Sequence, residues 1–207
     1  ENYVAPTCTT VGGYDMVVYC SKCGEEMSRE SHAALLNPFY NNSMVLANNL
    51  TISLNIKKDT LDAEELSNEG YYAVVTRIDA NGVRHETEIP MSEWRVHTKN
   101  RYQIYFNKLS AKEMSDELEL VLYNSDGEQV TVVYEISVRE HAMSEIEQYL
   151  ELGGYDKFVT LMVDMLNYGA AAQKYLNYNT DNLANSMLTA EHQSYATGKA
   201  VPMENID

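Results

Sequence analysis

The chain has 207 residues, of which 31 are acidic and 15 are basic, so its formal net charge at pH 7 is −16. This charge excludes nucleic-acid binding and docking on anionic lipid as expected functions, because both depend on clustered Lys and Arg. No apolar run approaches the roughly 20 residues of a spanning helix, so we expect no membrane insertion, and the start at Glu1 predicts a cut piece or a mature product of a longer protein.

The first 32 residues differ from the rest because they hold all three cysteines, Cys8, Cys20 and Cys23. Extended segments rich in Thr, Val and Tyr, at 3–10 and 14–19, flank Gly12-Gly13, and glycine supplies the positive φ of a tight hairpin. We therefore predict a first domain over 1–32, a small Cys-bearing β-ribbon in which the segment around Cys20 and Cys23 forms a second turn.

The predicted second domain spans 33–207 and begins with a connector at 33–47, where Pro38 and Asn41-Asn42 interrupt any helix. Short strands follow, as indicated by period-two alternation and by the turn dipeptides Asn81-Gly82 and Asp126-Gly127. We predict strands at 48–56, 71–78, 83–89, 94–96, 102–106, 117–123 and 129–136, and a helical turn at 62–66. This series of short strands is typical of a β-sandwich.

The hydrophobic period changes from two to between three and four after residue 137, which predicts two amphipathic helices. The first runs from Val138 to about Leu150 and ends at Gly153-Gly154, and the second runs from Asp156 to about Tyr178. The second helix is expected to be buried on more than one side. One face carries Phe158, Leu161, Met162, Met165, Gly169, Ala172 and Leu176, and it is widened by Val159, Val163, Leu166 and Ala170. The small residues at 169–172 allow another backbone to approach closely, and a short helix is expected at 189–196. The predicted fold class is therefore α+β: a Cys-bearing β-ribbon, then an antiparallel β-sandwich-like domain packed by two C-terminal helices.

The cysteine spacing is compatible with a metal site. A Cys-x2-Cys turn followed by Gly is a common half of a tetrahedral zinc site, so zinc is the one cofactor we expect, with Cys8, Cys20, Cys23 and His32 as candidate ligands. Two alternatives stay open at this point. One is a disulfide from Cys8 to Cys20 or to Cys23, and the other is three free thiols.

No sequence motif of a catalytic site is present, and we assign no catalytic residue. His141 and Glu145 share a helix face at i, i+4, but the second histidine of a zinc-protease helix is missing, so we interpret them as an exposed surface pair. Asp164 interrupts the apolar part of the second helix and is interpreted as part of its polar stripe.

The aromatic composition is skewed, with 16 Tyr against three Phe and one Trp. Tyrosine combines a rigid apolar face with a polar tip, which suits stacking on sugars or on a protein partner. The candidate ligand-binding residues on predicted strands are Trp94, Tyr71, Tyr72, Tyr102 and Tyr105. The competing interpretation is that these rings are simply half-buried in the sandwich.

Two segments resemble known sequences. Residues 5–30, which contain Cys8, Cys20, Cys23 and Gly24, resemble a Cys-rich repeat of secreted and cell-surface proteins of anaerobic Gram-positive gut bacteria. That repeat commonly carries a His upstream, for which this chain has no counterpart after Glu1. Residues 161–185 resemble the C-terminal helix of an uncharacterised module that recurs beside such repeats. The resemblance implies an extracellular or cell-surface, modular and non-catalytic setting.

The sequence thus predicts a non-enzymatic module of a larger surface protein, acting as a spacer, an adhesion element or a ligand-binding unit. Its expected partners are a cell-wall glycan or a host or bacterial surface protein. Two other hypotheses stay open: a carbohydrate-binding module with an exposed, coplanar aromatic platform that includes Trp94, and a hydrolase with a pocket where acids, or a His and an acid, converge.

Overall fold

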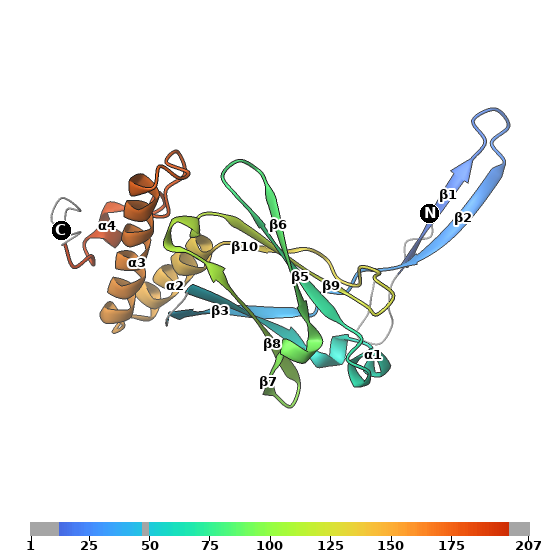
Figure 1. Cartoon of the computed structure of the whole chain (residues 1–207), viewed down its shortest axis with the longest axis horizontal. Coiled ribbons are helices and arrows are strands. Elements are labelled where there is room, and N and C mark those ends of the chain that lie inside the picture. The colour runs from blue at the N-terminus through green and yellow to red at the C-terminus, as the bar shows by residue number, and fades with distance from the viewer. Residues whose placement is uncertain (1–12, 47–49, 199–207) are drawn as a thin grey trace.

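In the computed structural model, which describes residues 13–46 and 50–198, the period-two segments form two four-stranded antiparallel sheets (Figure 1). The first sheet has the order β3-β4-β8-β7, formed by Phe39–Leu46, Leu50–Lys57, Arg101–Leu109 and Arg95–Thr98. The second has the order β10-β9-β5-β6, formed by Tyr134–Ile136, Glu117–Tyr123, Tyr72–Ile78 and Arg84–Pro90. The helices are α1 (Ala63–Ser67), α2 (Val138–Leu152), α3 (Asp156–Tyr175) and α4 (Ala190–Gln193). The predicted α+β class with sandwich-like sheets and C-terminal helices is confirmed.

The β-ribbon is a separate two-stranded sheet of β1 (Gly13–Tyr19) and β2 (Glu26–Ala33). It projects from the sandwich at the end opposite the C-terminal helices (Figure 1). Its tip is closed by two backbone hydrogen bonds, from the Cys20 amide to the Glu25 carbonyl at 2.7 Å and from the Gly24 amide to the Cys20 carbonyl at 2.9 Å. The predicted strand at 3–10 lies outside the described residues.

The hairpin of β5 and β6 forms where the Asn-Gly dipeptide predicts it. Gly82 has a φ of 76°, a conformation that favours glycine, and the Asp79 side chain accepts hydrogen bonds from the amides of Asn81 and Val83 at 2.8 and 3.0 Å. Local side-chain chemistry therefore determines this turn.

Two sequence-based predictions about strands are wrong. Residues 39–46 of the expected connector form β3, because an asparagine that is unfavourable in a helix is accepted in an edge strand, where Asn41 receives a hydrogen bond from Asn55 of β4 at 2.7 Å. The strand expected at 129–136 forms only from Tyr134 onward, because the backbone of Val130 and Val132 bonds instead to Leu36, at 2.9 Å in both cases.

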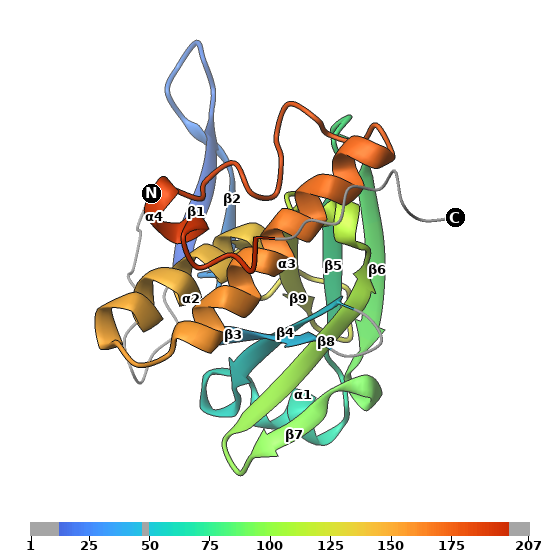
Figure 2. The ribbon, with the colours of Figure 1, turned by 90° about the vertical axis from the view of Figure 1, so that its left-hand side faces the viewer.

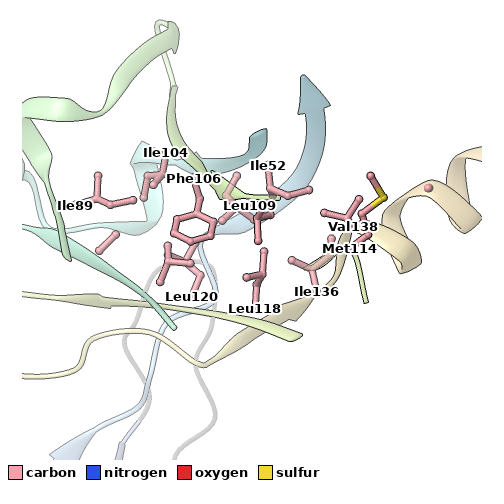
Figure 3. Close-up of a cluster of buried hydrophobic side chains, with 14 of the residues drawn as sticks. Ile52, Ile89, Ile104, Phe106, Leu109, Met114, Leu118, Leu120, Ile136 and Val138 are labelled. Atoms are coloured by element: carbon pink, nitrogen blue, oxygen red, sulfur yellow. The ribbon is translucent and has the colours of Figure 1, made fainter. Parts of the chain in front are cut away.

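The core lies between the inner faces of the two sheets and continues toward the helices. Figure 3 shows Ile52, Ile104 and Phe106 of one sheet facing Leu118 and Leu120 of the other. The row then continues through Ile136, Val138 and Met114, so the sandwich and α2 share one core. Each such side chain contributes about 1.5–3 kcal/mol when fully buried.

Helices α2 and α3 pack against each other beside the sandwich (Figure 2). Ser137 and Glu140 form a capping box at the start of α2, and Gly153, with a φ of 68°, follows its end. Gly169 of α3 lies against the short 3-10 helix Ala111–Glu113, since an added Cβ would come within 3.1 Å of the Ala111 carbonyl oxygen. The predicted close approach at the small residues of α3 is therefore confirmed.

The expected buried face of α3 is partly wrong. Leu161 is 49% exposed and Leu176, which lies just past the end of the helix, is 55% exposed, whereas Val159, Val163 and Leu166 are buried as expected. Among the described helices, none is long and apolar enough to cross a membrane.

A buried polar cluster ties the segment after α3 to the second sheet. The Asp116 carboxylate accepts hydrogen bonds from the Arg77 guanidinium at 2.7 Å and from the Tyr178 hydroxyl at 2.6 Å through the same oxygen, Oδ2. Asp116 is 3% exposed, and burial raises its pKa despite these two donors. We call Arg77, Asp116 and Tyr178 the hub.

Candidate functional site

A hollow lies beside α2 at the edges of the two sheets. β3 is the last strand of one sheet and β10 is the last strand of the other, and the first half of α2 lies beside both edges. The hollow has a volume of about 310 Å³, which is at the lower end of the range of about 300 to 1,000 Å³ for small-molecule sites. It is lined by Asn41, Asn42, Glu135, Ile136, Glu140, His141, Ser144 and Glu145.

His141 is the most unusual side chain of this hollow. It is 8% exposed, and neither of its ring nitrogens has a hydrogen-bond partner among the described residues. Burial lowers its pKa below the ordinary value of 6.5, so the imidazole is neutral at pH 7. A neutral imidazole offers one donor and one acceptor, and both are unused within the part of the chain described here.

Glu145 lies one helical turn after His141 and is half-buried. Burial raises the pKa of its carboxyl group, and no hydrogen bond or cation counteracts this effect. The prediction of an exposed surface pair is therefore wrong for His141, because α2 turns this face toward β3 and β10 rather than toward solvent.

Asn42 adds a second polar group without a partner. Its amide nitrogen donates to the Tyr134 hydroxyl at 2.7 Å, across the gap between the two edge strands. This bond fixes the amide, while Oδ1 is buried and has no hydrogen-bond partner. Buried side-chain polar atoms are normally bonded, so this wall of the hollow is incomplete on its own.

A smaller hollow, of about 210 Å³, lies beside the hub and is lined in part by Ser115, Asp116 and Asn182. Two of its lining residues are hydrogen-bonded to Gln173, which is fully buried. The Gln173 side-chain amide donates to the Ser115 hydroxyl at 2.9 Å and to the Asn182 backbone carbonyl at 3.2 Å. The side-chain oxygen Oε1 of Gln173 also accepts a hydrogen bond from the Ala184 backbone amide at 2.7 Å. These contacts give the region a structural role.

The predicted aromatic platform is not formed. Trp94 is 6% exposed, its indole nitrogen donates to the Ile89 carbonyl at 3.2 Å, and Tyr102 packs edge-on against it at 5.8 Å. Tyr71 is 4% exposed, and its hydroxyl accepts a hydrogen bond from the Asp62 amide. Because Trp94 and Tyr71 are buried in the core, a ligand at the surface cannot stack on either ring.

The other two candidate tyrosines do not share a surface. Tyr72 stacks on Tyr123 of the neighbouring strand at 5.3 Å, within the second sheet. Tyr105 belongs to the first sheet and alternates with the buried Ile104 and Phe106, so it points to the outer face, where the Arg95 guanidinium lies 4.2 Å from its ring centroid.

The candidate metal ligands separate into two groups. Cys20 and Cys23 lie together at the tip of the ribbon as free thiols, and the predicted disulfide to Cys8 involves a residue outside the described part of the chain. The amides of Lys22 and Cys23 donate to the Cys20 sulfur and lower its pKa. Cys8 lies outside the described residues.

The backbone of His32, the predicted fourth ligand, lies along the ribbon away from its tip. That backbone pairs with Tyr14, six residues before Cys20 along β1. At about 3.3 Å per residue this places it about 20 Å from the tip, whereas zinc must lie about 2 Å from every ligand atom. Among the described residues, no group of three or more His, Cys, Asp or Glu side chains is arranged to hold a metal ion.

Asp164 has a structural partner. Its carboxylate accepts hydrogen bonds from the Thr197 amide at 3.1 Å and hydroxyl at 2.9 Å, which holds the segment after α4 against α3.

The hollow could not be found from the sequence alone. The i, i+4 spacing of His141 and Glu145 was the one available signal, but Asn41, Asn42 and Glu135 reach the same place from strands far away in the chain. Comparison of the chain with protein-family models, curated proteins and solved structures finds no match.

Proposed function

We propose that this chain is a non-enzymatic, ligand-binding module of a larger extracellular protein, and that its ligand occupies the hollow between α2, β3 and β10. The observation that carries the proposal is His141, a buried imidazole on the wall of the hollow with no hydrogen-bond partner among the described residues. On the same wall, Asn42 Oδ1 is a buried atom without a hydrogen-bond partner, and a ligand in the hollow would bond to both side chains.

Binding is favoured over hydrolysis by the arrangement of the polar groups. A nucleophile and its general base lie within hydrogen-bond reach of each other in an activated pair. No hydrogen bond joins His141 to Ser144 or to Glu145 in the described part of the chain. The hollow therefore offers contacts to a ligand without a proton relay.

The extracellular setting rests on the acidic composition and on the resemblance of the Cys-rich segment. A strongly acidic surface keeps a protein soluble and repels other polyanions, which suits a module exposed at a cell wall. Cell-wall glycans and surface proteins are the partner classes that this setting implies.

The test is a binding screen of the chain against a glycan array and purified cell-wall fragments, with His141→Leu and Glu147→Gln as matched variants. Glu147 is exposed on α2 and does not line the hollow, so its variant is the control. We expect ligands that bind the wild type and Glu147→Gln but not His141→Leu. Equal binding by all three proteins, or cleavage products in the bound fraction, would contradict the proposal.

We also propose that the tip of the ribbon binds zinc through Cys20 and Cys23, with Cys8 as the third ligand predicted from the sequence. The supporting observation is the tight turn, in which two backbone amides donate to the Cys20 sulfur and favour a thiolate. Elemental analysis of protein purified without chelator is expected to give one zinc per chain in the wild type and none in a Cys20→Ser/Cys23→Ser variant. Absence of zinc from the wild type, or a mass two daltons lower from a disulfide, would overturn this assignment.

A further inference from the structure

We propose that the hollow selects ligands that carry a protonated amine, an inference that rests on the proposed function and specifies its ligand. Three properties of the hollow are relevant: the charge of its walls, the hydrogen-bonding groups that line it, and the spacing of its acidic side chains. Each of these favours an organic ammonium group over a neutral sugar, an anion or a metal ion.

The walls carry negative charge without a basic counterpart. Glu135, Glu140 and Glu145 line the hollow, and no Lys or Arg is among its described lining residues. The amino end of α2, which begins at Val138, contributes a partial positive charge equivalent to about half a unit. That partial charge is smaller than the charge of three carboxylates, so the hollow repels anions and attracts cations.

Glu140 and Glu145 differ in whether their carboxylates already accept a hydrogen bond from the chain. Glu140 accepts a hydrogen bond from the Ser137 amide at 3.1 Å as part of the capping box. Glu145 has no such donor, and burial alone raises the pKa of its carboxyl group. Glu145 is therefore the carboxylate that gains most from a cation in the hollow.

The remaining groups supply acceptors for the same ligand. Asn42 Oδ1 is unpartnered, and neutral His141 has an unused acceptor nitrogen. An ammonium group has three donors and no acceptor, so it matches a wall on which acceptors are in excess. A neutral sugar hydroxyl satisfies one acceptor at a time and leaves the charge of Glu145 uncompensated.

The spacing of the acids disfavours a bare metal ion. A divalent cation needs several oxygen or nitrogen ligands within about 2.6 Å of one point. No set of three or more acidic, His or Cys side chains among the described residues converges in this way. A volume of about 310 Å³ instead admits an organic amine the size of a hexosamine or a diamine.

The test is calorimetric titration of the whole chain with 1,4-diaminobutane, glucosamine and Nα-acetyl-lysine amide, which represent three sources of an amine. The matched neutral compound is N-acetylglucosamine, and calcium chloride is the metal probe. We expect at least one amine to bind, with an affinity that Glu145→Gln lowers by about tenfold and Glu147→Gln leaves unchanged. Thermal unfolding of both variants is recorded to show that they fold.

The possible outcomes separate this inference from the proposed function. If N-acetylglucosamine binds as tightly as glucosamine and His141→Leu abolishes both, the hollow is a ligand site and the preference for amines is wrong. If calcium binds more tightly than every amine, the amine inference is again overturned. If no amine or neutral sugar binds, and no cell-wall fragment distinguishes His141→Leu from wild type, both proposals fail.

Discussion

The hub and the hollow are both polar clusters at the boundary between the sheets and the C-terminal helices, but their side chains differ in the number of hydrogen bonds that they make within the chain. In the hub, Oδ2 of Asp116 receives two donors, from Arg77 and Tyr178, while Oδ1 has no partner in the described chain. In the hollow, His141 and Oδ1 of Asn42 receive none from the described chain. Matched partners stabilise a fold, whereas unmatched buried groups cost free energy unless something else binds them.

This difference teaches how to separate structural from functional polar residues in a chain with 31 acidic side chains. Burial alone does not distinguish them, since Asp116 and His141 are both more than nine-tenths buried. The number of hydrogen bonds that the whole side chain makes does distinguish them, since Asp116 accepts two and His141 has none in the described chain. The comparison predicts that hub variants lose stability and keep binding, while hollow variants keep stability and lose binding.

The largest effect is expected for Asp116→Ala. Removal of this carboxylate leaves the Arg77 guanidinium, whose side chain is 16% exposed, without its 2.7 Å partner. Because only the more distant Glu113 carboxylate, 3.6 Å from Arg77, then compensates this charge, the free energy of unfolding is expected to fall by about 3 kcal/mol, measured by urea denaturation. Amine affinity is expected to stay at the wild-type value. A decrease of less than 1 kcal/mol in the free energy of unfolding would mean that the hub does not stabilise the fold.

Gly169→Ala is expected to be the next most harmful change. The added Cβ would lie 2.6 Å from the Met114 sulfur and 3.1 Å from the Ala111 carbonyl oxygen, and the backbone contact cannot yield easily. Overpacking at this contact lowers stability by about 2 kcal/mol, even though Ala favours helix more than Gly. The same denaturation series checks it, and a gain in stability would show that α3 can move away.

Tyr178→Phe tests the hub through pH. Burial and the hydrogen bond to Asp116 raise the pKa of Tyr178 to about 12, so its hydroxyl stabilises the fold below the ordinary pKa of 10.0. That contribution is lost as pH rises from 10 through 12, because only the unfolded chain ionises readily in this range. Loss of the hydroxyl costs about 1 kcal/mol at pH 7. Wild type and variant should converge in stability above pH 11, and parallel profiles would contradict the assignment.

The smallest stability effect is expected for His141→Leu. Replacement of an unpartnered imidazole by an apolar side chain changes the free energy of unfolding by less than about 1 kcal/mol at pH 7. Because burial lowers the pKa of His141, the wild type loses stability as pH falls below 6.5, where the unfolded state takes up a proton first. The variant should lack this part of the acid sensitivity. A large loss at pH 7 would assign His141 a structural role.

Local signals in the sequence predicted local structure well. The Asn81-Gly82 turn and the end of α2 at Gly153-Gly154 depend on neighbouring residues only, and both form at the expected places. The identity of β3 was missed because Asn41 and Asn42 are stabilised by partners on β4 and near β10, which no short window contains.

The site was harder to predict than the fold. The identity of Trp94 does not reveal whether its side chain is exposed or buried. Its burial depends on the turn after β6, which places the indole nitrogen near the Ile89 carbonyl. The hollow needs α2, β3 and β10 together, so its walls exist only in the folded chain. The helical spacing of His141 and Glu145 was visible in the sequence, but the strands that bury His141 were not.

The most direct test of the central claim is a titration of the His141 ring nitrogens by ¹⁵N NMR with the amine that binds best in the calorimetric titration. If the hollow is a ligand site, the two His141 ring signals shift in a saturable way, and the signals of His85, which already bonds to Asp79 at 2.9 Å, stay unchanged. If the His141 signals do not move at concentrations that saturate binding, the ligand lies elsewhere and the account of the hollow is wrong.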